Sequence, residues 1–242
     1  MSGVDVATLA SSIDMTMLKP TVGFAEGAEW IDANAQRGFA TLCVSPFLVP
    51  LASQRLFDSS TRVCSVVAFP LGYASTEAKA DEAAGLVKLG AAEIDMVINV
   101  AALLEKESAF VRCDIEAVVD SVHHASNGEA IVKVILETGF LETADIERGC
   151  RLAVEAGAHF VKTSTGFGPR GATLEDVRTI RATVGPDVGV KAAGGIRDLG
   201  TALAMLAAGA TRLGTSAGGD ILAELERRDV AGKDSADAAT EG

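Results

Sequence analysis

The sequence predicts one α/β domain in which eight parallel strands close into a TIM (β/α)8 barrel. Eight apolar, strand-like segments alternate with eight segments of helical periodicity along the 242 residues. This alternation implies parallel strands joined by right-handed crossovers, and the length is common for one closed barrel. With 48% hydrophobic and only 5% aromatic residues, the interior must use small aliphatic side chains, as a parallel sheet under helices requires. An open doubly wound sheet is the alternative, but no Gly-x-Gly-x-x-Gly follows the first strand.

In chain order, the elements begin with a short N-terminal helix over residues 4–11. The first strand stops at Pro20, because proline has no N–H to donate. The later strands are nearly continuous apolar runs, which is typical of strands buried on both faces. We expect strands at residues 13–20, 39–44, 62–69, 93–100, 130–136, 159–163, 187–192 and 211–214.

The intervening helices carry start and stop signals. Pro46 suits a first helical turn, Ser75 suits an N-cap, and Thr173 with Asp176 suits a capping box. A break is expected near Glu107. The predicted helices cover residues 24–37, 46–57, 75–89, 101–125, 143–156, 173–183, 198–208 and 220–228.

The chain contains no internal linker or low-complexity block, so residues 1–228 are predicted to form one barrel domain. Residues 229–242 are acidic and small, with little apolar content. Such a segment buries too little surface to pack, and we expect a mobile C-terminal tail.

Composition and charge exclude several classes of protein. The formal net charge is −12 and no basic residues cluster, which argues against nucleic-acid binding. No basic segment followed by an apolar run opens the chain, and no apolar stretch reaches about 18 residues. We therefore expect no signal peptide, no membrane partner and a cytoplasmic location. The four cysteines are widely spaced, so we expect reduced thiols with neither a disulfide framework nor a zinc site.

Ionisable residues recur on one face of five different strands. They are Asp14 (with Thr16 on the same face), Asp95, Lys133, Lys162 and Lys191. In a barrel, alternate residues point inward, and those near the C-terminal strand ends form the active site. A structural ion-pair network is one interpretation, but so many charges in one interior fit a catalytic centre better.

Lys162 and Lys191 occupy corresponding places on consecutive strands, which lie side by side in a barrel. We expect each positive charge to disfavour protonation of the other. A neutral interior lysine can attack a carbonyl and form a Schiff base, and Asp95 could supply proton transfer. The structural alternative is that Lys162 pairs with a neighbouring carboxylate and only holds the core together.

Glycine-rich loops indicate phosphate binding. Gly194 and Gly195 follow the seventh strand, and the loop beginning at Gly214 follows the eighth. In many barrels these two loops hold a phosphate against a helix N-terminus. Thr165 and Gly166 can add hydroxyl and backbone donors. The three histidines show no spacing that suggests a metal site.

Six segments together resemble the class I deoxyribose-phosphate aldolases. The resemblance runs from about residue 8 to 228, and its motifs keep the family's order and spacing. The matching segments are IDMTMLKP (13–20), EIDMVIN (93–99), VKVILE (132–137), FVKTSTG (160–166), VKAAGGIR (190–197) and RLGTS (212–216).

This resemblance implies reversible cleavage of 2-deoxy-D-ribose 5-phosphate to D-glyceraldehyde 3-phosphate and acetaldehyde, without metal or organic cofactor. Lys162 matches the Schiff-base lysine, Lys191 the lysine that perturbs it, and Asp95 the proton-transfer aspartate. Family members are commonly homodimers, and some form larger assemblies. The implied phosphate loops contain Gly166, Gly194, Gly195, Gly214 and Ser216, and the implied pocket positions are Asp14, Thr16 and Cys43.

Three positions depart from the family pattern. Phe167 stands where some relatives place a basic residue, and Ala217 replaces a second serine. The only tyrosine is Tyr73, so a C-terminal tyrosine that some relatives carry is absent. We expect weaker phosphate discrimination. Another Schiff-base aldolase or transaldolase, and a non-catalytic sugar-phosphate-binding barrel, remain alternatives.

Overall fold

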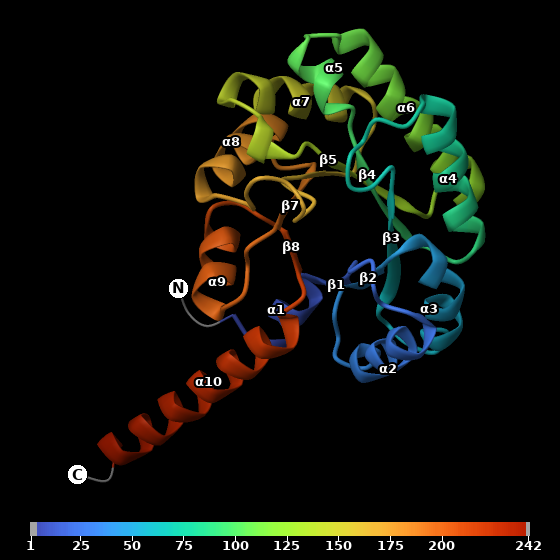
Figure 1. The fold of residues 1–242 in the computed structure, drawn as a ribbon. Coiled ribbons are helices and arrows are strands. Elements are labelled where there is room, and N and C mark those ends of the chain that lie inside the picture. The colour runs from blue at the N-terminus through green and yellow to red at the C-terminus, as the bar shows by residue number, and fades with distance from the viewer. Residues whose placement is uncertain (1–3, 241–242) are drawn as a thin grey trace.

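A computed structural model describes the backbone of residues 4–240 and the side chains of residues 4–230. Each strand pairs in parallel with the next along the chain, and β8 returns to pair with β1, so the barrel is closed (Figure 1). The predicted TIM barrel is confirmed, and the open sheet is excluded. The strands are β1 (Ile13–Met17), β2 (Thr41–Val44), β3 (Arg62–Val67), β4 (Glu93–Val97), β5 (Ile131–Ile135), β6 (Phe160–Lys162), β7 (Gly189–Ala193) and β8 (Arg212–Thr215).

The helices form a ring outside the strands (Figure 1). The predicted N-terminal helix is present as α1 (Val6–Ser11). The others are α2 (Phe24–Asn34), η1 (Pro46–Leu48), α3 (Val49–Arg55), α4 (Thr76–Lys88), α5 (Val100–Leu104), α6 (Ser108–Ser126), η2 (Thr138–Phe140), α7 (Thr143–Glu155), α8 (Leu174–Val184), α9 (Leu199–Ala207) and α10 (Gly218–Thr240).

Local sequence signals set several helix ends. Ser75 caps α4 by accepting a hydrogen bond from the N–H of Ala78. Thr173 and Asp176 form the predicted capping box of α8. The expected break near Glu107 separates α5 from α6. The short helix η2, directly after β5, was not predicted.

The strand side chains form two sets. Apolar residues such as Ile94, Val161 and Val190 are fully buried and alternate with the ionisable residues of the same strands. Residues of these two sets must face opposite sides of the sheet. The layer between strands and helices is therefore aliphatic, and the charged set faces the barrel axis.

The C-terminal helix is longer than predicted. The sequence predicts that this helix ends at residue 228, whereas α10 continues to Thr240. Propensity explains the difference, because residues 229–240 contain no proline and only one glycine. The mobility of the tail over residues 229–242 stays a prediction, and residues 241 and 242 lie outside the described residues.

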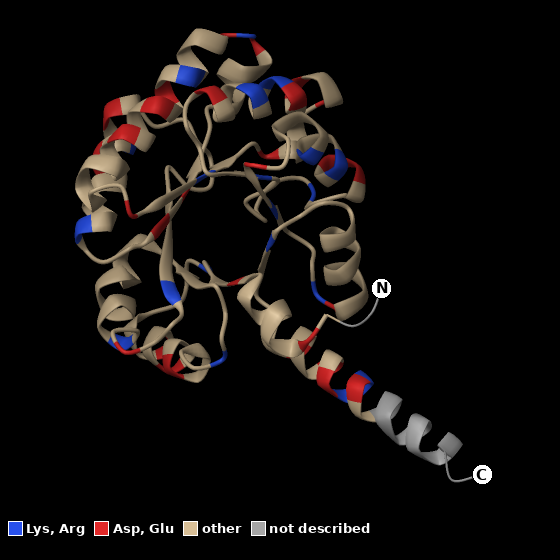
Figure 2. Cartoon of the chain, turned by 180° about the vertical axis from the view of Figure 1, so that it is seen from behind, with Lys and Arg blue, Asp and Glu red and all other residues tan. Residues whose placement is uncertain are grey.

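Charged residues fall into two groups (Figure 2). One group covers the outer helices, and a second lies on the strands around the barrel axis. Over residues 4–240, we find no helix with the length and apolar character needed to span a membrane.

Candidate active site

Asp95 joins three lysines inside the barrel. Its Oδ2 lies 2.7 Å from Nζ of Lys162 and 2.6 Å from Nζ of Lys191, and its Oδ1 lies 2.9 Å from Nζ of Lys133. Lys162 and Lys191 are register partners on β6 and β7, as their sequence positions predicted. All four side chains are buried, so these charges are shielded from water.

A second layer of charges lies beneath this group. Asp14 contacts Lys191 at 2.5 Å and Arg212 at 2.6 Å, and Glu93 contacts Lys133 at 2.6 Å and Arg212 at 3.1 Å. With Asp95 and Lys162, the network contains four basic groups and three carboxylates. One basic group is therefore in excess.

Opposite charges set the direction of the pKa shifts of Lys191 and Asp95. Burial lowers the pKa of Lys191, but the attraction of Asp14 and Asp95 outweighs burial and leaves this pKa raised. Burial raises the pKa of Asp95, but Lys133, Lys162 and Lys191 together hold it well below its ordinary value. The expectation that the two lysines suppress each other's protonation is therefore wrong for Lys191, because carboxylates lie against it.

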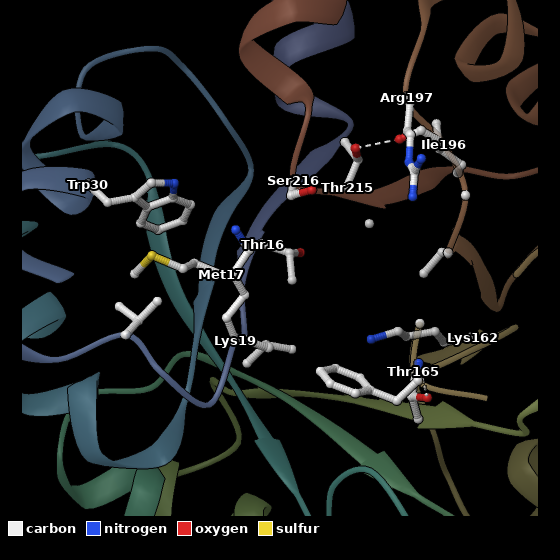
Figure 3. Close-up of a pocket in the computed structure, with 18 of the residues that line it drawn as sticks. Thr16, Met17, Lys19, Trp30, Lys162, Thr165, Ile196, Arg197, Thr215 and Ser216 are labelled. Carbon is white, nitrogen blue, oxygen red and sulfur yellow. Dashed lines mark hydrogen bonds between the residues drawn. The ribbon is translucent and has the colours of Figure 1, made fainter. Parts of the chain in front are cut away.

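A cavity of about 440 Å³ opens above this network at the C-terminal ends of the strands. The amine of Lys162 points into it (Figure 3). Lys162 therefore pairs with a carboxylate, as the structural alternative proposed, and also has space for a ligand beside it. The predicted site residues that line the cavity are Thr16, Lys162, Thr165, Gly166, Gly194, Gly195, Gly214 and Ser216.

The remaining predicted site residues lie below the cavity. Asp14, Asp95, Lys133 and Lys191 belong to the charge network, and Cys43 is fully buried beside Cys64. Cys43, Cys64 and Asp95 place possible metal-ligand atoms within 4.8 Å of one another. Three lysines around Asp95 oppose a cation there, because like charges repel strongly in a buried setting.

Two positions in the cavity wall favour glycine, one because of its backbone conformation and the other because of its close neighbours. Gly166 has φ +88°, a conformation that other residues adopt only with strain, and open space lies where its side chain would be. At Gly214, an added Cβ would lie 3.0 Å from Cε of Lys191 and 2.9 Å from Cβ of Ala193. The absent side chain at Gly214 therefore leaves room for Lys191.

Comparison with known proteins identifies the family. The family model described as DeoC/LacD family aldolase matches residues 10–224. The chain belongs to this aldolase family. The charge network, the cavity and all six motif segments lie within the matched residues.

Curated relatives carry a more specific name. Deoxyribose-phosphate aldolase 1 of Bacillus licheniformis is 48% identical over 217 residues, which cover 90% of this chain and 96% of the relative. Deoxyribose-phosphate aldolase of Alkaliphilus oremlandii is 49% identical over 224 residues, which cover 93% and 99%. This chain is thus similar to them over nearly their whole length.

Solved structures agree with the family assignment. A chain described as QR15, an aldolase, has a TM-score of 0.85 at 39% identity, covering 92% of this chain and 98% of that one. A putative deoxyribose-phosphate aldolase from Coccidioides immitis has a TM-score of 0.87 at 39% identity, covering 93% and 88%. The family fold therefore extends over more than nine-tenths of this chain.

Several residues of the cavity and of the charge network beneath it were not predicted from the sequence. Arg197 and Lys19 add two cationic side chains to its wall, and Trp30 adds an aromatic one. Arg197 follows directly after Gly194-Gly195-Ile196, so its place in that motif was a usable signal. Cys64 was also missed, and its Sγ lies 3.3 Å from Oδ1 of Asp95.

Phe167, one of the departures from the family pattern, also lines the aldolase cavity. Its ring packs edge-on against Phe69, with centroids 5.4 Å apart. The position that is basic in some relatives is therefore an apolar part of the wall here. Ala217 is not part of this wall, and Tyr73 is an exposed side chain away from it.

Proposed function

We propose that this chain is a class I aldolase that reversibly cleaves 2-deoxy-D-ribose 5-phosphate to D-glyceraldehyde 3-phosphate and acetaldehyde. The observation that carries the proposal is the position of Lys162. Among the lysines and arginine of the buried network, Lys162 is the one that lines the cavity. Family membership and the curated relatives support the same reaction.

Lys162 is the proposed Schiff-base residue. The network has one basic group more than it has carboxylates, so a neutral Lys162 leaves it balanced. A neutral Nζ attacks the substrate's C1 aldehyde to give a carbinolamine, which takes up a proton and loses water to give the iminium. Because the iminium itself withdraws electrons, the proposed reaction needs neither a metal nor an organic cofactor.

Asp95 and Lys191 are the proposed proton-transfer group. Loss of the proton from the C3 hydroxyl lets the C2–C3 bonding pair move into the iminium, which releases D-glyceraldehyde 3-phosphate and leaves an enamine. Protonation at C2 and hydrolysis then release acetaldehyde and restore Lys162. Oδ2 of Asp95 contacts both amines, so with a water molecule it can pass protons between them and the substrate.

The remaining interior residues have proposed supporting roles. Asp14 holds Lys191, Lys133 holds Asp95, and Cys43 packs at the base of the site. Thr16 lies on the cavity wall, where a hydroxyl can contact the sugar. These buried contacts hold the charged groups in place.

The end of β8 and the loops after β6, β7 and β8 form the proposed phosphate end. Thr165, Gly166, Gly194, Gly195, Gly214 and Ser216 all line this part of the cavity. α9 and α10 begin shortly after two of these loops, and a helix N-terminus favours an anion. Arg197 adds a positive side chain, so an acidic protein can still bind a phosphate locally.

We also propose a homo-oligomer, with a dimer favoured, and a cytoplasmic location. One similar structure, from Aeropyrum pernix, is described as tetrameric; it has a TM-score of 0.83 at 30% identity and covers 92% of each chain. Light scattering of the purified chain tests the number of subunits directly.

The decisive experiment is borohydride trapping with 2-deoxy-D-ribose 5-phosphate, followed by peptide mapping and a parallel assay for acetaldehyde. We expect an adduct on Lys162 and loss of turnover by several orders of magnitude in Lys162→Met. Lys88→Met, at an exposed position on α4, is the matched control and should keep full activity. Sugar binding by the wild type without an adduct or acetaldehyde would instead indicate a non-catalytic binding barrel.

A transaldolase or another Schiff-base aldolase would also form an adduct at Lys162, but with a different sugar phosphate. Repeating the trapping with fructose 6-phosphate separates these functions. We expect an adduct with deoxyribose 5-phosphate at much lower concentration. The reverse preference would overturn the proposed substrate.

A further inference from the structure

Glu137 has two unfavourable features at the point where the chain leaves β5. Its backbone is left-handed, with φ 58° and ψ 61°. Its carboxylate is buried, and Oε1 has no hydrogen-bond partner among the described residues. Both features cost free energy, and strained residues of this kind concentrate at functional sites.

The carboxylate of Glu137 holds the loop after β6. Oε2 accepts hydrogen bonds from the backbone N–H of Thr165, at 3.2 Å, and from the hydroxyl of Thr165. The same hydroxyl oxygen accepts a hydrogen bond from the N–H of Phe167, at 3.0 Å. One continuous chain of hydrogen bonds therefore runs from Glu137 to the loop that contains Gly166.

The backbone on both sides of Glu137 is fixed to the end of β6. The N–H of Leu136 donates to the carbonyl of Lys162 at 3.0 Å, and the N–H of Thr138 donates to the carbonyl of Thr163 at 2.9 Å. These contacts explain why the left-handed conformation persists. They also place the carboxylate beneath the loop, so closely that a Cβ on Gly168 would lie 2.7 Å from Cδ of Glu137.

These hydrogen bonds conflict with the prediction that the hydroxyl of Thr165 donates to the phosphate. A hydroxyl group has one proton to donate. Thr165 gives that proton to Glu137, so it has none for a phosphate in the cavity. The loop must then offer backbone groups, and Gly166 faces open space there.

We propose that Glu137 is a positioning residue for the phosphate end of the cavity and acts through the hydroxyl of Thr165. It fixes residues 165–167 so that the backbone at Gly166 receives the phosphate. Glu137 is not one of the residues that line the cavity. The inference rests on the proposed aldolase function.

The test compares kcat/KM for 2-deoxyribose 5-phosphate with kcat/KM for 2-deoxyribose. Glu137→Gly accommodates the left-handed backbone but removes the carboxylate. We expect it to lower the ratio of these two values by about tenfold or more, as small misplacements of binding groups commonly do. Glu137→Gln keeps an acceptor for Thr165 and should retain most of the ratio. Glu142→Gln, at an exposed position nearby, is the matched control.

Thr165 provides a second, independent pair of variants. Thr165→Val keeps the shape and removes the hydroxyl, so it should match Glu137→Gly, and the double variant should add little further loss. Thr165→Ser keeps the hydroxyl and should therefore lower the ratio less than Thr165→Val does. If kcat/KM falls equally for both substrates, Glu137 does not have this role. The same conclusion follows if Thr165→Ser and Thr165→Val lower the ratio equally.

Titration with inorganic phosphate gives a readout without turnover. We expect weaker phosphate binding in Glu137→Gly and Thr165→Val than in the wild type. Unchanged phosphate affinity in both variants would overturn the inference. A wild type that forms no Schiff base with deoxyribose 5-phosphate would instead overturn the proposed function, so the two failures are distinguishable.

Discussion

Nζ of Lys162 lies 2.7 Å from Oδ2 of Asp95, at the boundary between the cavity and the buried charge network. The contact ties the one network amine that lines the cavity to the carboxylate that reaches all three lysines. We therefore expect reactivity toward a substrate and stability of the interior to depend on the same carboxylate.

Asp95→Asn should reduce both activity and stability. The substitution keeps the shape but leaves three lysines facing a neutral amide. We expect a loss of turnover by more than a hundredfold and a loss of about 3 kcal/mol in the free energy of unfolding, because breaking a buried pair leaves uncompensated charge. Acetaldehyde release and urea unfolding measure the two effects. Asp187→Asn, at an exposed position, should change neither; wild-type turnover in Asp95→Asn would contradict the proposed proton transfer.

Lys191→Met should slow Schiff-base formation near neutral pH. The pKa of Lys191 is raised by Asp14 and Asp95, so this side chain stays positive throughout the neutral range. Its removal takes away the like charge that favours a neutral Lys162. We expect the rising limb of the pH–rate profile to move to higher pH. Lys191→Arg keeps the charge and should move it less; an unchanged profile in Lys191→Met would rule out the coupling.

Arg197→Met should weaken binding of phosphorylated substrates selectively. Arg197 lines the cavity next to the glycine loop after β7. We expect KM for 2-deoxyribose 5-phosphate to rise about tenfold, because a hydrogen bond to a charged group contributes roughly 1.5–3 kcal/mol. KM for 2-deoxyribose should stay unchanged. An equal rise for both sugars would show that Arg197 does not contact the phosphate.

Phe167→Lys should have the opposite effect at the same end of the cavity. The wild-type ring is an apolar part of the wall, and a lysine there would add a positive charge to a cavity that Lys19 and Arg197 also line. We expect KM for 2-deoxyribose 5-phosphate to fall severalfold, with the gain reduced at high salt. Phe167→Met controls for loss of the ring contact with Phe69. A gain in that variant as well would attribute the effect to shape.

The fold should lose stability at alkaline pH, where the buried thiol of Cys150 ionises. Burial raises the pKa of this thiol from 9.0 to about 12, so the folded state holds the proton more tightly than the unfolded state. The resulting stability is fully present below pH 9 and is lost as the pH rises through about 12. The whole shift corresponds to about 4 kcal/mol.

Urea unfolding between pH 8 and 11 tests this prediction. The difference in unfolding free energy between the wild type and Cys150→Ala should shrink as the pH rises. Cys113→Ala, at an exposed cysteine, is the matched control. A constant difference for Cys150→Ala as well would show that the thiol does not titrate differently in the two states.

The barrel and its inward-facing charges could be predicted from patterns along the chain. Hydrophobic periodicity and the alternation of strand and helix segments predicted eight parallel strands. Because side chains alternate along a strand, Asp95, Lys162 and Lys191 were predicted to face the same side of the sheet. These properties are local, because neighbouring residues on a strand must point to opposite sides of the sheet. The resemblance to known aldolases then supplied a role for each residue, which the spacing alone does not contain.

Which charged groups contact one another could not be predicted from the sequence, because it depends on how the barrel closes. Closure of the barrel brings Arg212 on β8 against Asp14 and Glu93, and it places two carboxylates against Lys191. These contacts depend on the registers of all eight strands, which no single segment encodes. The left-handed turn at Glu137 is likewise imposed by hydrogen bonds to the end of β6, since glutamate has no preference of its own for that conformation.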